Sequence, residues 1–463
     1  MRKDRDIVAL LESCAIMKPN FYLRTEKPVR ITRRELCRAL GSIAAGILPL
    51  RGLATKNAAL ASSGPFGKPE SMMTSPDNEA ESLATGHESY LGSLAPVIRS
   101  IQQEHGFPLA YDRRGEISAK EWSRRGRASI SSGLAYLPAS VPLDVRLKLR
   151  VSRAGYELRV ISFAGTSHYR IPAFLLIPEG KGPFPAVVAL HDHGGEYYFG
   201  KEKLVEMDQE HAALTSFKKT YYDGRSYASE LARSGYVVVV ADCFYWGERR
   251  LTYTYPPTSY RQAVAGLDAS SERYVSVVDD FLEQRTADLI TLLGYNGLNW
   301  LGIVSYDDMR AVDLLVSLPE VDSRRIGCIG LSGGGFRSTY LAGRDARIHA
   351  GVIVAWMTTL PTTLDLAEKS HADIFDSYVV HAGLDHPDVA SLAAPDCALF
   401  VLNCGRDELF TAEGMRLAVE RIRGIYQNLN HAERFQARVY DVPHLFNTQM
   451  QKEAFLWLDR WLK

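Results

Sequence analysis

The chain has 463 residues with 54 basic and 54 acidic side chains, so its formal net charge at neutral pH is zero. This balance excludes the basic excess on which nucleic-acid and anionic-membrane binding depend, and we expect neither partner. Hydrophobic residues make up 46% of the chain, as in ordinary globular proteins. The six cysteines have no C-x-x-C spacing, which favours buried free thiols over a zinc site or a disulfide framework.

Residues 1–61 resemble an export signal of the twin-arginine type. Thr-Arg-Arg-Glu-Leu-Cys-Arg at 32–38 precedes a weakly apolar run at 39–50, and the small-residue sequence Ala-Leu-Ala at 59–61 follows. The apolar run is too short to serve as a stable membrane anchor. We therefore expect a periplasmic or extracellular bacterial protein; the alternative is a cytoplasmic protein with a basic amphipathic helix.

Residues 62–82 are rich in Ser, Gly, Pro and Asn, which indicates a flexible linker. We interpret residues 83–463 as one domain. Its first part, 83–144, carries helical patterns at 83–106 and 118–136 and is expected to pack against the rest as a helical extension.

From residue 145 the pattern changes to that of a sheet. Antiparallel entry strands are predicted at 145–151, 156–163 and 171–177. Continuous apolar runs, typical of parallel strands buried on both faces, follow at 185–190, 237–242, 325–331, 348–354 and 398–402, and a short strand at 435–440. Helical patterns lie between them at 225–234, 304–317, 335–343, 412–428 and 448–462. This alternation predicts an α/β fold with a mostly parallel sheet and helices on both faces.

The strand at 325–331 runs directly into Gly330-Leu-Ser332-Gly-Gly334, a G-x-S-x-G sequence. A sharp strand-to-helix turn there places a serine hydroxyl clear of the sheet, at a helix N-terminus. We predict that Ser332 is a nucleophile. The alternatives are a glycine-rich packing turn and a phosphate-binding loop.

A serine nucleophile needs a base, and the base needs an orienting carboxylate. Asp407 follows the strand at 398–402, and His444 lies between the strand at 435–440 and the last helix. This Ser-Asp-His order is the one expected for the fold, so we predict Asp407 as the acid and His444 as the base. Glu408 is the second candidate for the acid.

The predicted oxyanion hole combines two backbone N–H groups. One belongs to Gly333, and the other to His193 or Gly194 in the loop His191-Asp-His-Gly-Gly195. An alternative makes His191 and His193 metal ligands, but no further cluster of ligand residues lies nearby in the sequence. We expect neither a metal nor a cofactor.

Further residues at strand ends are predicted to line the pocket. Trp246 and Glu248 follow the strand at 237–242, and Trp356 follows the strand at 348–354. Residues 248–275, rich in Tyr and Pro, fit either a lid or a packed surface loop.

Together these motifs resemble the α/β-hydrolase superfamily, and within it the dienelactone-hydrolase-like and acetyl xylan esterase-like bacterial branch. The matching segments are 190–195, 307–315, 319–322, 325–327, 330–335 and 443–446. Dienelactone hydrolases proper use a cysteine nucleophile, whereas Ser332 stands here.

The resemblance implies a serine esterase that acts through Ser332, Asp407, His444 and an acyl-enzyme, and the twin-arginine-type signal implies that it is exported. A small-molecule or carbohydrate ester, acetylated or otherwise acylated, is the implied substrate. A peptidase or an acyltransferase of the same fold, or a binding module without catalysis, are the alternatives. The oligomeric state is left open.

Overall fold

A computed structural model describes residues 89–366 and 383–463. The predicted signal at 1–61 and the predicted linker at 62–82 lie outside the described residues. Within the described ranges, every helix is too short or too polar to cross a membrane.

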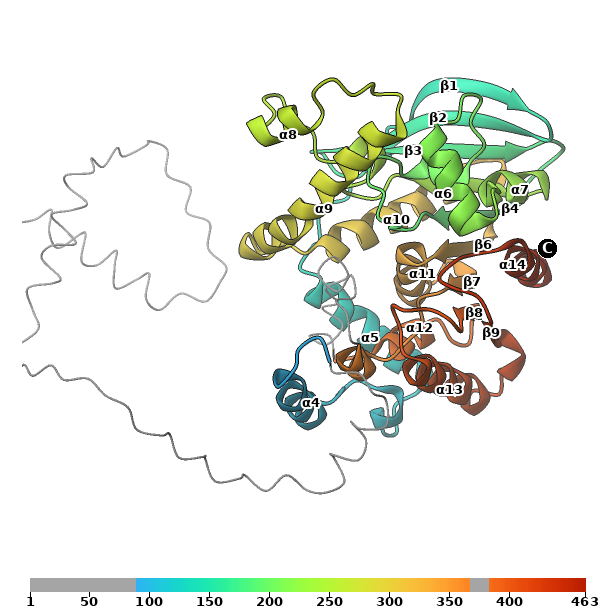
Figure 1. Ribbon diagram of the computed structural model, residues 1–463. Helices are drawn as coiled ribbons and strands as arrows, with labels where there is room; N and C mark the ends of the chain where they lie inside the picture. Colours follow the sequence, from blue (N-terminus) through green and yellow to red (C-terminus); the bar gives the residue numbers. More distant parts are fainter. Residues whose placement is uncertain (1–88, 367–382) are drawn as a thin grey trace, which may run out of the picture. The chain divides into compact units, whose positions relative to one another are not determined.

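The nine strands of residues 89–366 and 383–463 form one sheet in the order β1-β2-β3-β5-β4-β6-β7-β8-β9 (Figure 1). The first three pair antiparallel with their neighbours, as does β3 with β5, and all remaining pairs are parallel. The strands are β1 Arg146–Arg153, β2 Tyr156–Ala164, β3 Arg170–Pro178, β4 Phe184–Leu190, β5 Val237–Ala241, β6 Val321–Leu331, β7 Ile348–Val354, β8 Ala398–Cys404 and β9 Phe435–Tyr440. The predicted α/β architecture is confirmed.

Two hydrophobic cores lie on opposite faces of this sheet. Along β4, Ala186, Val188 and Leu190 belong to one core, and the alternating Val187 and Ala189 belong to the other. Successive side chains of a strand point to opposite faces, so β4 is buried on both. This explains why its sequence is a continuous apolar run rather than an alternating one.

Eleven helices are described within residues 89–366 and 383–463, and they flank the sheet. They are α4 Leu94–His105, α5 Ala119–Gly133, α6 Ala212–Tyr222, α7 Tyr227–Arg233, α8 Thr258–Ala263, α9 Glu272–Tyr295, α10 Trp300–Ser317, α11 Gly333–Arg344, α12 His386–Ser391, α13 Ala412–Asn428 and α14 Thr448–Leu462. Four of them (α6, α8, α9 and α12) were not predicted. In α9 the buried Val275, Val278 and Leu282 follow the helical period, and the Ser271 side chain accepts from the N–H of Tyr274 to cap its start.

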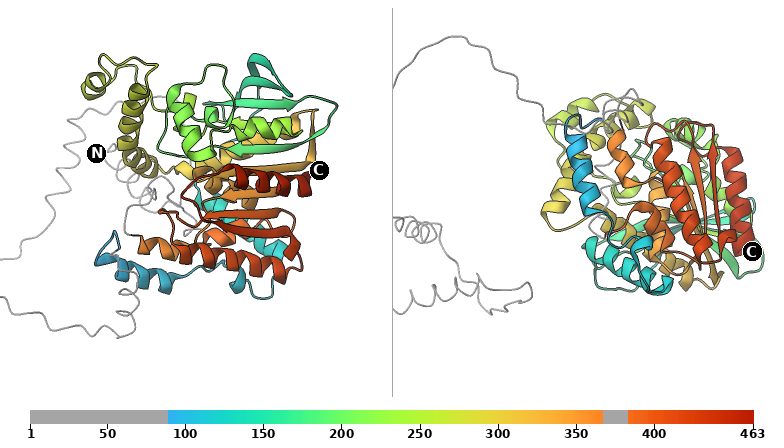
Figure 2. Two further views of the ribbon diagram at one scale, coloured as in Figure 1. Left: turned by 45° about the vertical axis from the view of Figure 1, so that its right-hand side comes forward. Right: turned by 90° about the horizontal axis from the view of Figure 1, so that it is seen from below.

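The helix α5 from the predicted N-terminal extension contacts the sheet-bearing part of the chain. Arg127 donates to the carbonyl of Gly343 at 2.8 Å and to that of Leu392 at 3.0 Å. A Cβ on Gly126 would lie 2.5 Å from the end of the Leu392 side chain, so a larger residue would require that side chain to move. The helix α5 therefore packs beside α11 and α12, away from the antiparallel strands β1, β2 and β3 (Figures 1 and 2).

Candidate active site

Ser332 occupies the sharp turn between β6, which ends at Leu331, and α11, which begins at Gly333. Its backbone has φ 56° and ψ −120°, a strained conformation for a residue with a Cβ. A Cβ on Gly334 would lie 2.0 Å from the carbonyl oxygen of Leu190, the last residue of β4. Glycine at this position therefore lets the start of the helix approach the end of the neighbouring strand.

Asp407 and His444 lie on the loops that follow β8 and β9. His444 Nδ1 is 2.7 Å from Asp407 Oδ2, and Asp407 Oδ1 accepts from the N–H of Leu409 at 3.0 Å. The Asp407 side chain is fully buried, whereas Glu408 is exposed. His444 Nε2 has no hydrogen-bond partner in the described parts of the chain, the Ser332 hydroxyl included. The ring is thus held from one nitrogen, and its other nitrogen is buried without a hydrogen-bond partner in the described residues.

Two of the three residues predicted for the oxyanion hole lie at one cavity, and Gly194 is not among its lining residues. Gly333 and His193 line one small cavity of about 10 Å³, roughly the space of a single water molecule. Gly194 has φ +60°, and a Cβ there would lie 2.4 Å from Asp192 Oδ2 and 2.5 Å from the ring of Phe217. Both its backbone conformation and its surroundings therefore require glycine.

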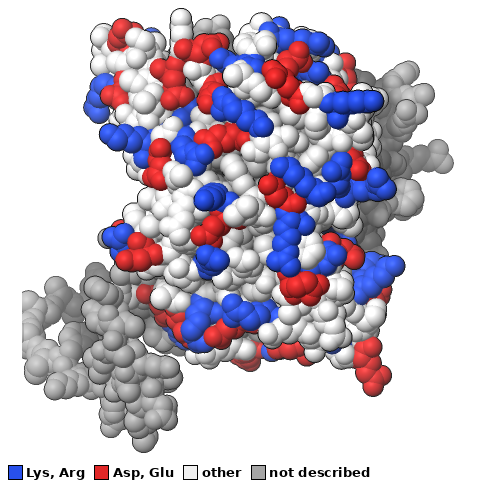
Figure 3. Space-filling model, turned by 90° about the vertical axis from the view of Figure 1, so that its right-hand side faces the viewer, with Lys and Arg blue, Asp and Glu red and all other residues white. Residues whose placement is uncertain are grey.

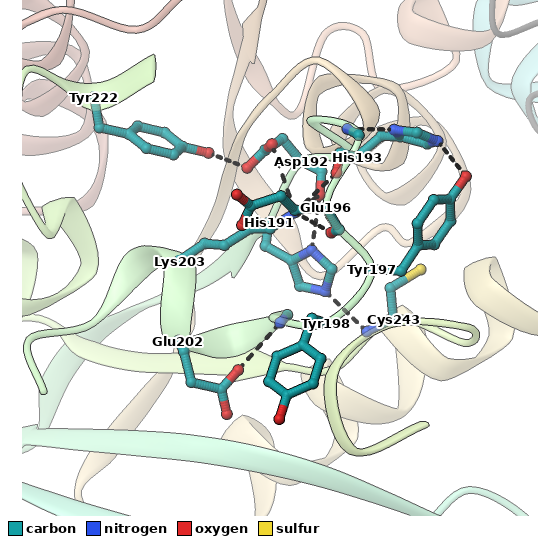
Figure 4. Close-up of polar contacts among 12 residues, drawn as sticks. His191, Asp192, His193, Glu196, Tyr197, Tyr198, Glu202, Lys203, Tyr222 and Cys243 are labelled. Atoms are coloured by element: carbon teal, nitrogen blue, oxygen red, sulfur yellow. Dashed lines mark hydrogen bonds and ion pairs between the residues drawn. The ribbon is translucent and has the colours of Figure 1, made fainter. Parts of the chain in front are cut away.

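Both histidines of this loop are buried and hydrogen-bonded within the protein (Figure 4). His191 Nδ1 lies 3.0 Å from the carbonyl oxygen of Asp192, and its Nε2 accepts from the N–H of Cys243 at 3.0 Å. Burial lowers the pKa of His191 well below its ordinary value, so its ring is neutral. His193 Nδ1 accepts from the N–H of Gly195 at 2.9 Å, and its Nε2 lies 2.9 Å from the Tyr197 hydroxyl. Among residues 89–366 and 383–463 no cluster of His, Cys, Asp or Glu is arranged to hold a metal.

A buried ion pair ties the helix of Ser332 to the same loop. Arg337 of α11 binds Asp308 of α10 through two hydrogen bonds, of 3.0 and 2.6 Å, and also donates to the carbonyl of His191 at 3.3 Å. Both side chains are 3% exposed. The carboxylate raises the pKa of the Arg337 guanidinium against the opposing effect of burial, which is the larger single influence. The arginine therefore stays charged and links α11 to the loop after β4.

Comparison with known proteins finds a family match over part of the chain. Residues 221–394 match the dienelactone hydrolase family. Over this segment, which is less than half of the chain, the protein is similar to that family. The matched segment contains Ser332 and ends before Asp407 and His444, which lie on the later strand-end loops.

The same comparisons found a curated relative and similar solved structures. The chain is 25% identical over 333 residues, 71% of its length and 96% of the relative, to a Bacillus subtilis (strain 168) protein described as a hydrolase, YtaP. A Bacteroides fragilis structure described as an acetyl xylan esterase has a TM-score of 0.52 at 18% identity, covering 74% of this chain and 81% of that one. A glucuronoyl esterase from Solibacter usitatus has a TM-score of 0.50 at 14% identity, covering 76% and 96%.

These structural similarities show the α/β-hydrolase fold, in agreement with the predicted resemblance. The match to the dienelactone hydrolase family and the hydrolase relative support a carboxylic ester hydrolase. The individual roles of its residues remain predictions at this point.

The three predicted pocket residues lie in different surroundings. Trp246 is buried, stacks on Tyr197 at 4.8 Å and lines the same cavity as Gly333. Trp356 is buried between aromatic rings, 4.8 Å from Phe336 and 5.2 Å from Phe410. The Glu248 carboxylate is not among the groups that line the cavity. It pairs with Lys148 at 2.8 Å and with Lys201 at 3.0 Å.

The segment predicted as a lid or a packed loop, 248–275, contains the short helix α8. Tyr253 and Tyr260 pack edge-on against Phe281 of α9, with ring centroids 6.0 and 4.9 Å apart. The helices α8 and α9 lie together at one end of the ribbon (Figures 1 and 2). These aromatic contacts hold one side of the segment against α9. The choice between a lid and a packed surface loop stays a prediction.

Sequence reasoning missed the buried cations around the oxyanion loop, Lys203 and Arg337. Their partners lie far from them in the sequence or are backbone carbonyls, so no local spacing reveals the contacts. The sequence does carry a signal for Arg337. It is an arginine with apolar or small neighbours inside the helix that follows Ser332, which indicates a buried charge. For Lys203 no comparable signal exists.

Proposed function

We propose that the protein is an exported serine esterase in which Ser332, His444 and Asp407 form the catalytic triad. The observation that carries this proposal is the 2.7 Å hydrogen bond between His444 and the buried Asp407, which leaves the other ring nitrogen without a hydrogen-bond partner in the described residues. The strained elbow at Ser332 supports it, because that backbone conformation persists in proteins mainly at functional sites.

In the proposed mechanism, His444 Nε2 takes the proton of the Ser332 hydroxyl as its oxygen attacks the ester carbonyl carbon. The carbonyl oxygen becomes an oxyanion and accepts hydrogen bonds from the N–H of Gly333 and from that of His193 or Gly194. The carbon–oxygen bond to the alcohol then breaks, and the leaving alcohol receives the proton from His444. This leaves an acyl group on Ser332.

Water completes the cycle. It attacks the acyl carbon while giving a proton to His444, the acid product leaves, and Ser332 regains its proton. Asp407 accepts the hydrogen bond from Nδ1, which keeps Nε2 in the form that accepts a proton and stabilises the imidazolium. No cofactor takes part in these steps.

The proposed substrates are acylated carbohydrates. Structures with the same fold are described as an acetyl xylan esterase and a glucuronoyl esterase. The twin-arginine-type sequence at 32–38 supports export, which would place the enzyme where polysaccharide esters occur. Replacing Arg33 and Arg34 by lysine should leave the precursor in the cytoplasm on cell fractionation, and unchanged export would contradict a twin-arginine route.

The test is hydrolysis of p-nitrophenyl esters, from acetate to octanoate, by the full chain and by Ser332→Ala. We expect turnover that is highest with short acyl groups and absent in the variant, together with labelling of the wild type by a fluorophosphonate. Acetylated xylo-oligosaccharides follow as natural substrates. A folded wild-type protein that neither turns over any ester nor reacts with the fluorophosphonate would overturn the proposal.

A further inference from the structure

Lys203 carries a buried ammonium group behind the loop at 191–196 (Figure 4). Its Nζ lies 3.2 Å from the carbonyl oxygen of Asp192, 2.8 Å from that of His193 and 2.9 Å from that of Glu196. A lysine ammonium has three N–H donors and no acceptor, so three carbonyls use its whole capacity. A neutral amine has only two donors, so this arrangement requires the charged form.

Two further contacts balance that charge inside the protein. Asp192 Oδ2 lies 3.8 Å from Nζ, and the ring face of Phe217 lies 4.7 Å from it. The other carboxylate oxygen of Asp192 accepts from the Tyr222 hydroxyl. Asp192 is 2% exposed and Lys203 is 0% exposed, so neither charge is compensated by water.

The direction of the carbonyl groups that Lys203 binds determines the direction of the N–H groups predicted as oxyanion donors. In a trans peptide the C=O and the following N–H point in opposite directions. The Asp192 carbonyl shares its peptide unit with the N–H of His193, and the His193 carbonyl shares its unit with the N–H of Gly194. Both peptide bonds are trans, since the cis bonds of the described chain are at Pro183 and Pro395.

The ammonium therefore collects two carbonyls on one side of the loop and turns the N–H groups of His193 and Gly194 to the other side. These are the two alternatives proposed for the second oxyanion donor, and Gly333, the first donor, lines the same cavity as His193. A positive charge at the oxygen end of a peptide unit also polarises it, which strengthens hydrogen bonds given by its N–H.

The geometry assigns Lys203 as a positioning residue of the oxyanion hole, with Asp192 as its counter-charge. The lysine touches no substrate in this assignment and acts through the two peptide units. The assignment rests on the proposed esterase function and deepens it, since it names what orients the donors of that site.

The first test compares Lys203→Met with Lys218→Met. Lys218 is a matched control, because it is 2% exposed, donates to the carbonyl of Val205 at 2.8 Å and pairs with Glu210, away from the loop. Active sites are counted by fluorophosphonate titration, so that loss of folded protein is separated from loss of rate. The inhibitor is an alkyl trifluoromethyl ketone, which adds to the serine as a tetrahedral oxyanion.

For Lys203→Met we expect kcat per titrated site to fall about 100-fold, as when an oxyanion donor is removed, with KM changed less than about threefold. The affinity for the trifluoromethyl ketone should fall by the same factor as kcat/KM. Lys218→Met should leave all three quantities within about threefold per site. If Lys203→Met loses only titratable sites, or keeps its rate and inhibitor affinity per site, the lysine is merely structural and the assignment is overturned.

A second test needs no variant. The wild-type enzyme is inactivated with diethyl p-nitrophenyl phosphate, and the crystal structure of the Ser332 adduct is determined. We expect the phosphoryl oxygen within hydrogen-bond distance of the N–H of Gly333 and of His193 or Gly194. An adduct whose oxygen lies elsewhere would overturn the assignment of Lys203 while leaving the serine mechanism intact. Failure of Ser332 to form an adduct would overturn the esterase mechanism, and the assignment with it.

Discussion

The acid–base pair and the oxyanion loop of the candidate site are held by different interactions. Asp407 and His444 follow β8 and β9, which are adjacent parallel strands, so their C-terminal ends meet at one edge of the sheet. The topology alone brings these two side chains close, and a single 2.7 Å hydrogen bond fixes them. The loop at 191–196 also follows a strand, but its function depends on which way its peptide units point.

That orientation is set by buried charges rather than by the sheet. Lys203 gathers the loop carbonyls from one side, and Arg337 holds the carbonyl of His191 from the helix of the nucleophile. On the molecular surface shown in Figure 3, by contrast, basic and acidic side chains are interspersed without a patch of one sign. Buried charged side chains therefore lie where backbone groups must have a defined orientation. Strand order alone is enough where two side chains only have to lie close together.

The largest effect is expected on the acid–base side. Asp407→Asn keeps the shape of the residue but removes the charge that stabilises the imidazolium and the acceptor that selects the His444 tautomer. We expect kcat to fall about 10⁴-fold, because the base then presents the wrong nitrogen form to Ser332. Steady-state ester hydrolysis measures it, with near-UV circular dichroism as the check of folding.

Glu408→Gln is the control for Asp407→Asn. Glu408 is the exposed neighbour and the second sequence candidate, and its loss should leave kcat within about threefold. A greater loss in Glu408→Gln than in Asp407→Asn would reverse the assignment of the acid.

A smaller effect is expected from Gly194→Ala in the oxyanion loop. The added methyl group would lie 2.4 Å from the Asp192 carboxylate, and φ +60° disfavours alanine. The loop must shift, so kcat should fall about 100-fold with little change in KM. Gly224→Ala, also at positive φ but with open space around its Cβ, is the control for backbone strain alone. Equal rates in the two variants would show that the loop tolerates the shift.

The sequence predicted the strands well because each buried parallel strand is a continuous apolar run. It also predicted the positions of Ser332, Asp407 and His444 after strand ends, since their order along the chain follows the topology. The 24-residue helix α9 was not predicted, although its capping residue Ser271 and the spacing of its buried residues are both typical of a helix.

The charged groups around the oxyanion loop were not predictable for a different reason. Lys203 binds backbone oxygens, which every residue carries, so no residue type marks its partners. Asp308 and Arg337 are 29 positions apart on two helices, and their pairing depends on how those helices pack. Buried ion pairs of this kind depend on tertiary structure, whereas apolar runs and strand ends can be recognised from a short stretch of sequence.

The smallest effect concerns the acidic residue at the end of the oxyanion loop. Burial raises the pKa of Glu196 from its ordinary value of 4.5 to about 8, against the opposing charge of Lys203. The folded protein therefore holds a proton that the unfolded chain has lost, and its stability must decrease as the pH rises from about 4.5 to about 8. Glu196→Gln cannot ionise and removes this dependence. In paired thermal unfolding scans the variant should gain a few degrees in Tm over the wild type on going from pH 5 to pH 9. The same Tm difference at both pH values would show that Glu196 is already ionised in the folded loop, in which case the charge balance around Lys203 includes a second carboxylate.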